Sequence, residues 1–415
     1  MLGVLRHRDF GLLWTGQAVS LIGDGIYLVA IAWLVYDLSN SPAALGLVGL
    51  AWTLPQVMAL LGSGVLSDRF ERRRLLIAAD LLRVAAIGGI AALTIADAVE
   101  LWHVTVLVVF YGLGEALFLP AFSAIVPDVV PKEELLQAAT LKELVEPIGL
   151  RFAGPAVGGA LNATAGVGAA FAVDAVSFAV SAAVVSLMSR QPPPDKEPSP
   201  LRRELGQGFA YVRAHAWLWA TLASAAVALL ASFGPTEVLL PFIIRNDLDG
   251  GAGTFGLVLS AGGVGSVMAA LVMSWTGAPR RHVTFMYLTW SLGIALQAGY
   301  AVAGAAWQMC VVAFLSFGCL TAGMVVWGTL IQTLVPAEML GRVSSLDWFV
   351  SIGLVPVSFA LTGPIAELVG AKATLAGAAA IGAASSAALF IPGVRAPEAD
   401  PLPGGRRRSG AVAGR

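Results

Sequence analysis

GVLSDRFERRR, at residues 64–74, lies between two strongly apolar runs of the sequence, one that ends near residue 66 and one that begins at residue 74. A glycine, an Asp-Arg pair and a basic cluster are thereby confined to a very short connection. We interpret this connection as a loop between two membrane-spanning helices. Because basic loops are retained on the cytoplasmic side of a membrane, the cluster also predicts the side on which the loop lies.

The composition excludes an ordinary soluble domain. Hydrophobic residues make up 57% of the chain and charged residues only 12%, and the mean hydropathy is +0.80. A chain of 415 residues can hold about twelve spans of roughly 20 residues with short connections. We therefore predict an all-α membrane protein with twelve transmembrane helices. The expected helices are 10–36, 43–66, 74–95, 101–123, 137–161, 166–188, 216–241, 253–275, 283–303, 306–334, 343–367 and 371–391.

Basic residues are distributed unevenly over the expected loops. The loops on one side and both tails are rich in arginine, whereas the opposite loops hold only Arg245 and Lys372. The positive-inside rule then predicts that both termini are cytoplasmic. Abundant Ala, Gly and Arg are typical of a GC-rich bacterial source, so we expect a multi-pass protein of a bacterial cytoplasmic (inner) membrane, surrounded by the lipid bilayer. No nucleotide-binding loop, metal-ligand cluster or nucleic-acid module is visible in the sequence, which predicts no enzymatic activity, no cofactor and no nucleic-acid partner.

The 64–74 stretch resembles the G-x-x-x-D-R-x-x-R-R signature loop of the major facilitator superfamily of secondary transporters. The resemblance implies two pseudo-symmetric six-helix bundles with the substrate site between them near the membrane midplane. It also implies a monomer and an energy source in an ion gradient.

The resemblance further implies a gating loop. Its members would be Gly64, Asp68, Arg69, Arg72 and Arg73. In this interpretation Asp68 latches the cytoplasmic ends of the two halves together when the cavity faces outward. The alternative is that the arginines only set the topology. Glu71 stands where the family often has a second glycine, so the fine structure of the latch departs from the family pattern.

Internal matches indicate a duplicated chain. They are GLV at 46–48 and 256–258, VMA at 57–59 and 267–269, and VPKEEL at 130–135 against VPAEML at 335–340. Three matches in the same order at nearly the same offset indicate duplication better than any one of them. We expect an N-terminal six-helix bundle at 1–188, a cytoplasmic linker with a surface helix at 189–215, a C-terminal bundle at 216–395 and a disordered cytoplasmic tail at 396–415.

The expected fifth helix contains Gly154, Pro155, Gly158 and Gly159, a pattern that resembles the G-P-x-x-G-G motif of the antiporter branches of the superfamily. Small residues let two helix backbones approach closely, and proline bends a membrane helix. Plain packing is the alternative explanation. Together with the 64–74 loop, the motif favours an exporter. The arginine that many drug–proton antiporters carry in helix four is absent ahead of Gly112, so the commonest coupling scheme is not implied.

Four ionisable residues fall deep inside the expected spans. They are Asp24, Glu115, Arg151 and Asp174, all in the first half of the chain. A charge at such depth costs about 3 kcal/mol or more, so it normally faces a wet cavity or a partner. We assign these residues to proton coupling or to the cavity. The alternative is a structural network in which Asp24 or Glu115 neutralises Arg151. In the second half only Glu237, toward the outer face, is comparable, which predicts an apolar wall there.

The start of the chain carries a narrower resemblance. LRHRDFGLLW at 5–14 and QAVSLIGD at 17–24 resemble a drug–proton antiporter branch that includes macrolide-efflux proteins and the enterobactin exporter. The resemblance implies proton-coupled export of amphipathic drugs or secondary metabolites by alternating access. Two alternatives remain open: a siderophore, metabolite or lysolipid transporter of the same fold, and a membrane sensor or scaffold that does not transport.

Overall fold

The computed structural model describes residues 2–190 and 201–399. Side chains at 60–69 and 201–205, and at positions 2, 132, 136, 139–140, 142–144 and 337, lie outside this description. The described residues form helices and no strand. Lipid offers no hydrogen-bond partner to a backbone N–H or C=O group, so apolar runs of this length are stable in a bilayer as helices, which satisfy these groups internally.

The first half of the chain holds a bundle that ends at α7. Its elements are η1 (Leu2–Arg6), α1 (Arg8–Ser39), α2 (Pro42–Arg69), α3 (Arg72–Ile95), α4 (Leu101–Val129), η2 (Lys132–Glu134), α5 (Leu135–Glu146), η3 (Pro147–Ala153), α6 (Gly154–Ala165) and α7 (Val167–Ser186). The helix expected at 137–161 is interrupted by η3, which is a π-helix. Pro147 opens this segment, where a proline lacks the N–H that an uninterrupted α-helix would use.

The second half follows α8 (Leu201–Ala214), which fits the short helix expected after the linker. Its elements are α9 (Ala216–Asp247), α10 (Ala252–Thr276), α11 (His282–Leu296), α12 (Gly299–Val302), α13 (Ala306–Leu334), α14 (Ala337–Gly353), α15 (Val355–Val369), α16 (Ala371–Ala384), η4 (Ser385–Phe390) and η5 (Ala396–Ala399). The tail expected at 396–415 thus begins with a 3-10 turn, and its residues from 400 onward lie outside the described part.

Ten helical segments of the described chain are long and apolar enough to cross a membrane. The expected spans 137–161 and 283–303 are not among them, because each is interrupted and its pieces are short. A corresponding turn occurs late in each half. Gly166 at φ 84° joins α6 to α7, and Gly370 at φ 88° joins α15 to α16, in a left-handed conformation that favours glycine.

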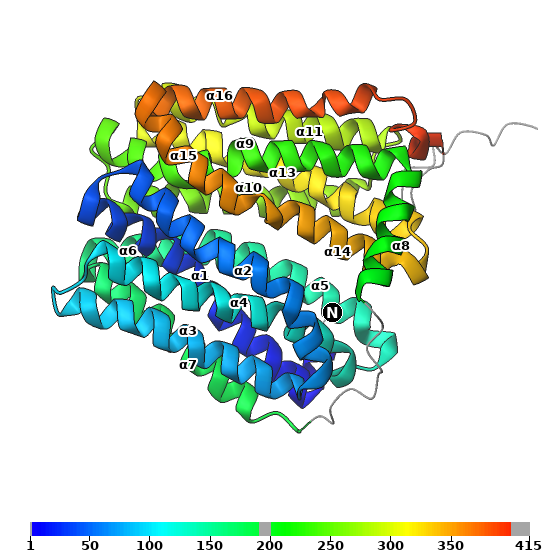
Figure 1. The fold of residues 1–415 in the computed structure, drawn as a ribbon, viewed down its shortest axis with the longest axis horizontal. Helices are drawn as coiled ribbons and strands as arrows, with labels where there is room; N and C mark the ends of the chain where they lie inside the picture. The colour runs from blue at the N-terminus through cyan, green and yellow to red at the C-terminus, as the bar shows by residue number, and fades with distance from the viewer. Residues whose placement is uncertain (1, 191–200, 400–415) are drawn as a thin grey trace, which may run out of the picture.

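The two halves lie side by side and are joined along two seams (Figure 1). One seam packs α2 against α15, and the other packs α6 and η3 against α10. At one end of the molecule the helices of the halves meet, and toward the α8 end α2 and α14 diverge (Figure 1). The helix α8 runs across the direction of the long helices at that end (Figure 1).

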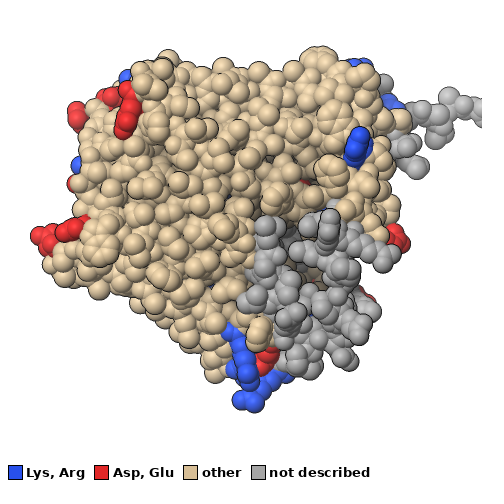
Figure 2. Space-filling model, viewed as in Figure 1, with Lys and Arg blue, Asp and Glu red and all other residues tan. Residues whose placement is uncertain are grey.

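The surface is consistent with a lipid environment. On the face in Figure 2, Lys, Arg, Asp and Glu gather toward the two ends, and a broad uncharged band lies between them. Large apolar side chains such as Leu368 (84% exposed) and Phe390 (78% exposed) are open to the surroundings. Such a band has the character of a membrane-embedded belt, because water would penalise it and lipid does not.

Candidate substrate cavity and coupling site

Three carboxyl side chains of the first half form one cluster, which we call the carboxyl cluster (Asp24, Glu115 and Asp174). The Tyr111 hydroxyl of α4 donates to Asp24 Oδ1 of α1 at 2.8 Å, and the Ser177 hydroxyl donates to Asp174 Oδ1 at 3.4 Å. A Cβ added at Gly23 would lie 2.4 Å from Asp174 Oδ1, so α1 and α7 approach closely here. Asp174 is fully buried, whereas Asp24 is only half-buried.

Aromatic side chains connect Glu115 to the rest of the carboxyl cluster. The Trp52 indole N–H donates to Glu115 Oε2 at 2.6 Å. The rings of Trp52 and Tyr111 have centroids 6.0 Å apart, and Tyr27 lies 4.6 Å from Tyr111. The charges of Asp24 and Glu115 act on each other. These contacts bring together three of the four ionisable residues that the sequence singled out.

The cation beside this cluster is Arg83, whose place the sequence did not reveal. Arg83 of α3 is 3% exposed and pairs with the fully buried Asp80. Its guanidinium carbon lies 4.3 Å from the ring centroids of both Phe118 and Phe178. Its charge acts on each member of the carboxyl cluster. The sequence did hold a signal for a buried cation. Arg83 lies eleven residues after Arg72, roughly 16 Å along the helix, and is therefore deep in the membrane span.

Arg151 lies apart from the carboxyl cluster and faces the second half. It is exposed, on the π-helix η3, and its guanidinium carbon lies 5.3 Å from the ring centroid of Phe317 of α13. Its charge acts on Glu237 of α9. The structure therefore joins Arg151 electrostatically to the second half, and not to Asp24 or Glu115 as the alternative network had supposed.

A cavity that is partly open to the surroundings lies between the halves, with about 410 Å³ of space between its walls when open solvent is included. Its wall is mostly apolar and aromatic and comes from α1, α2, α9, α10 and α15. The lining residues are Tyr27, Leu28, Ile31, Ala32, Leu45, Val48, Gly49, Trp52, Glu237, Phe255 and Phe359. Trp52 and Tyr27 belong both to this wall and to the aromatic group around the carboxyl cluster. A ligand in the cavity would therefore contact Trp52, which holds Glu115, and Tyr27, whose ring packs on Tyr111, the residue that holds Asp24.

The glycines of the fifth-helix motif serve two different contacts. Gly154 packs on α1, where an added Cβ would meet the Gly25 Cα at 2.6 Å. Gly159 packs on the second half, since its added Cβ would meet the Gly256 Cα at 3.2 Å. Gly158 also faces α1, and Pro155 contributes its carbonyl to the contact with Gly256. The motif thus permits the close approach of α6 to α1 and of the two halves to each other.

The 64–74 loop can be followed only in part. The side chains of Gly64, Asp68 and Arg69 lie outside the described residues. Arg72 pairs with Asp128 at the end of α4, and Arg73 donates to the carbonyls of Val185 and Ser186 at the end of α7. Glu71, which departs from the family pattern, accepts a 2.7 Å ion pair from Arg74. Each of these contacts stays within the first half.

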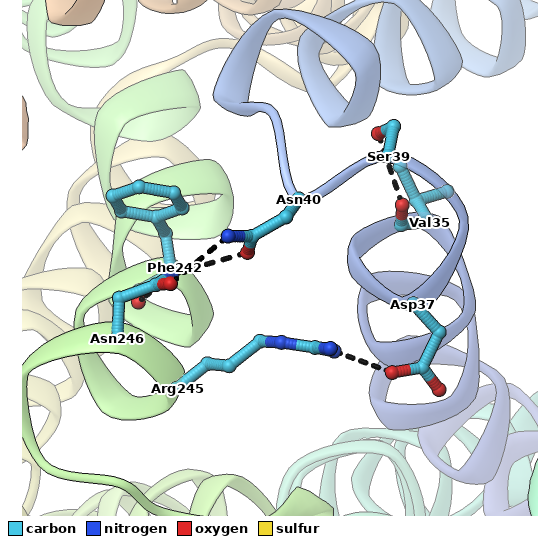
Figure 3. A network of polar contacts seen from close by, with 7 residues as sticks. All are labelled: Val35, Asp37, Ser39, Asn40, Phe242, Arg245 and Asn246. Atoms are coloured by element: carbon cyan, nitrogen blue, oxygen red, sulfur yellow. Dashed lines mark hydrogen bonds and ion pairs between the residues drawn. The ribbon is translucent and has the colours of Figure 1, made fainter.

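A polar network holds the halves together at the opposite end, which we call the closed end (Figure 3). Arg245 of α9 pairs with Asp37 of α1, and Asn40 and Asn246 exchange hydrogen bonds of 3.0 and 3.2 Å. Asn40 adopts a left-handed conformation (φ 46°) that ends α1, a position where asparagine is tolerated. Deeper in the same end, the buried Tyr36 hydroxyl donates to the carbonyl of Val238 at 2.6 Å.

Two helical bundles, a cavity between them and buried carboxyls beside it define a membrane transporter. The chain matches the model of the transmembrane secretion effector family over residues 1–406, and it belongs to that family of major facilitator transporters.

Relatives of known name are similar over most of the chain. Macrolide efflux protein A of Streptococcus pyogenes is 25% identical over 373 residues, which cover 87% of this chain and 90% of that protein. The multidrug efflux pump Tap of Mycolicibacterium fortuitum is 28% identical over 379 residues, covering 85% and 88%. The enterobactin exporter EntS of Shigella boydii is 27% identical over 345 residues, covering 82% and 81%.

Solved structures share the fold at low sequence identity. A bacterial homologue of the iron transporter ferroportin, in an inward-facing state, has a TM-score of 0.65 and 17% identity, and the match covers 92% of this chain and 99% of that one. A bacterial homologue of the lysosomal transporter Spinster, inward-facing and unoccupied, has a TM-score of 0.66 and 14% identity over 94% and 96%.

Proposed function

We propose that this chain is a proton-coupled secondary active exporter of amphipathic drugs or secondary metabolites that works by alternating access. The observation that carries the proposal is the junction of cavity and carboxyl cluster through Trp52 and Tyr27. A ligand on that wall and a proton in that cluster can influence each other's binding because they share these side chains. The efflux relatives support the direction of transport.

We further propose that the chain works as a monomer in a bacterial cytoplasmic membrane with both termini in the cytoplasm. The closed end would then face away from the cytoplasm, and the diverging α8 end would face it. In this orientation the structure corresponds to an inward-facing state. The proton gradient would supply the energy, and no cofactor would take part.

The proposed coupling rests on electrostatics within the carboxyl cluster. Like charges in a poorly solvated site repel, and the nearby cation Arg83 is already paired with Asp80. A proton on Asp24, Glu115 or Asp174 therefore relieves repulsion. We infer that in the outward-facing state a carboxyl of the cluster binds a proton from outside the cell, and that the substrate then leaves. After the return to the inward-facing state the proton departs and substrate enters. Asp68 would latch the cytoplasmic ends in the outward-facing state.

The test uses inverted membrane vesicles with an acidic interior reported by a quenched pH-sensitive dye. Macrolides, cationic dyes and siderophores are added in turn. We expect one class to release protons from vesicles with the native chain and not from vesicles with Asp24→Asn. A matched control is Asp97→Asn, which neutralises an exposed carboxylate in the α3–α4 turn. Equal proton release in the native chain and in the Asp24, Glu115 and Asp174 amide variants would contradict the role of the carboxyl cluster.

A siderophore is the second candidate substrate, and the similarity to the enterobactin exporter favours it. The same vesicle assay separates the candidates, because a siderophore exporter would respond to that member of the panel and not to macrolides or cationic dyes.

A further inference from the structure

A strip of buried polar side chains leads away from the carboxyl cluster along α7. Asp174, Ser177 and Ser181 follow one another at spacings of three and four residues, so they lie on one face of the helix. Asp174 and Ser181 are completely buried, and Ser177 is 6% exposed. The strip points toward the end of α7 at Ser186, whose carbonyl accepts a hydrogen bond from Arg73 at the start of α3. It therefore runs from the carboxyl cluster toward the end of the first half that carries the 64–74 loop.

The helix α1 covers this strip. A Cβ added at Gly23 would lie 2.1 Å from the Ser177 hydroxyl oxygen, and one added at Gly16 would lie 3.2 Å from the Ser181 hydroxyl oxygen. Ser20 is 1% exposed and lies on α1 between these two glycines, four residues from one and three from the other. Residues at that spacing share a face of a helix. The three serine hydroxyls therefore belong to the contact between α1 and α7.

Asp80 of α3 borders the same strip. It is completely buried, and Ser181 lies close enough to influence its carboxyl group. One carboxyl oxygen of Asp80 pairs with Arg83, whose charge also acts on Asp174. The strip thus has a carboxyl group at each end and serine hydroxyls between them. Asp174 is the end in the carboxyl cluster, and Asp80 is the end nearer to Arg72, the first residue of α3.

Several buried atoms of the strip lack a hydrogen-bond partner of normal geometry within the described part of the chain. They are Ser20 Oγ, Ser181 Oγ, Asp80 Oδ2, Asp174 Oδ2 and Oε1 of the half-buried Gln17 of α1. A buried polar atom without a partner costs about 1–3 kcal/mol, and proteins normally satisfy such atoms with ordered water. A hydroxyl group both donates and accepts hydrogen bonds. Hydroxyls and water between two carboxyl groups therefore form a chain along which a proton can move.

We propose that Ser20, Ser181 and Asp80 line a proton route inside the first half, which connects the carboxyl cluster to the α8 end without passing through the cavity. The inference rests on the proposed proton-coupled export and specifies the path of the proton. The Asp174 carboxyl gives up its O–H proton and becomes a carboxylate. Each hydroxyl, water or carboxylate of the route accepts one proton and passes one on, and the last proton goes to water beside Gln17.

The route and the cavity are separate. The cavity wall contains none of the residues of the strip, and the strip lies in the contact between helices of the first half alone. Substrate can therefore enter the cavity while the proton leaves by a different path, and the two need not pass each other.

The experiment measures how fast the buried carboxyl gains a proton in the purified full-length protein. A light flash releases protons from a caged acid, and time-resolved infrared spectroscopy follows the carbonyl band of the protonated carboxyl, which is assigned by its loss in Asp174→Asn. The test variants are Ser20→Ala, Ser181→Ala and the double variant, each of which removes a hydroxyl and adds no bulk. The matched control is Ser316→Ala in the second half, another completely buried serine, whose hydroxyl donates to the Gly293 carbonyl at 2.7 Å.

We expect the native protein and Ser316→Ala to gain the proton at the same rate. Ser20→Ala and Ser181→Ala should slow the rise of the band roughly tenfold or more, which corresponds to about 1.4 kcal/mol in the barrier, and should leave its final height unchanged. An unchanged rate in the double variant would overturn the proposal, because the proton then reaches Asp174 by another path. So would a lower band at an unchanged rate, equal slowing in Ser316→Ala, or a native protein in which no band depends on Asp174.

The infrared measurement needs neither substrate nor a proton gradient, so this test is independent of the vesicle assay. A chain whose Asp174 gains its proton through these serines, and which exports nothing, contradicts the proposed function alone. A chain that exchanges protons for substrate, and in which the serine variants gain the proton at the native rate, contradicts this inference alone.

Discussion

Breaking the closed end should shift the protein toward its outward-facing state. The side chains of Arg245 and Asp37 are 30% and 47% exposed, so their ion pair is worth at most about 1 kcal/mol. Arg245→Ala should therefore favour the open arrangement of this end by about fivefold. Adding Tyr36→Phe removes a buried hydrogen bond worth about 1 kcal/mol. The double variant should shift the equilibrium by roughly 30-fold.

The assay is a distance measurement between two spin labels by double electron–electron resonance. Cysteines replace Ala98 and Ala373, which are exposed near this end in the first and second halves. The native Cys310 and Cys319, which form no disulfide, are replaced by alanine. We expect a short distance to dominate in the labelled parent protein and a longer distance to grow in Arg245→Ala.

A charge exchange tests the cause of that shift. The double variant Asp37→Arg with Arg245→Asp restores an ion pair in the same place, so it should return the distance distribution toward that of the parent. The reasoning is refuted if Arg245→Ala leaves the distribution unchanged, or if the charge exchange behaves like the single variant.

Two further predictions concern the close packing of the halves and the buried ion pair of Asp80 and Arg83. A Cβ at Gly256 would lie 2.4 Å from the Pro155 carbonyl oxygen, so Gly256→Val should force the halves apart and reduce transport strongly in vesicles. Gly377 has open space around it, so Gly377→Ala should transport like the native chain. If Gly256→Val transported as well as the native chain, the close packing of α6 against α10 would not be needed for transport, contrary to this prediction. Asp80→Asn should strand a buried guanidinium and lower the free energy of unfolding by about 3 kcal/mol, seen as a lower melting temperature in detergent. Adding Arg83→Met should recover much of that loss, and an unchanged melting temperature in Asp80→Asn would contradict the importance of the pair.

The fold class followed from the sequence because lipid restricts the choices. Apolar runs separated by short basic loops leave helices as the stable form, and the structure confirms an all-helical membrane protein. The predicted number of twelve membrane-spanning helices is not confirmed, because ten helical segments of the described chain are long and apolar enough to span. The segments 137–161 and 283–303 have the right composition, but η3 and the break before α12 interrupt them. Local interruptions of this kind depend on packing between helices, which hydropathy does not record.

The sequence predicted how deep in the membrane the site residues lie, but not which way their side chains face. Counting residues along a helix places Asp24 and Glu115 near the middle, where a buried charge needs a reason. It does not say which way a side chain faces, because a helix that is apolar on every side has no periodic pattern to orient it. That is why Arg151 was grouped with these carboxyls, and why the position of Arg83 beside them was not predicted. Glu237 was noted only for its depth and not for its place in the cavity.

The central claim is that substrate in the cavity and a proton in the carboxyl cluster exclude each other. The most direct measurement mixes purified protein with a macrolide, or with tetraphenylphosphonium, in weakly buffered solution containing a pH indicator. We predict that binding releases protons from the native protein and that Asp24→Asn, which binds the same ligand, releases fewer. Saturable binding to the native protein with no release of protons at any pH tested would contradict the claim.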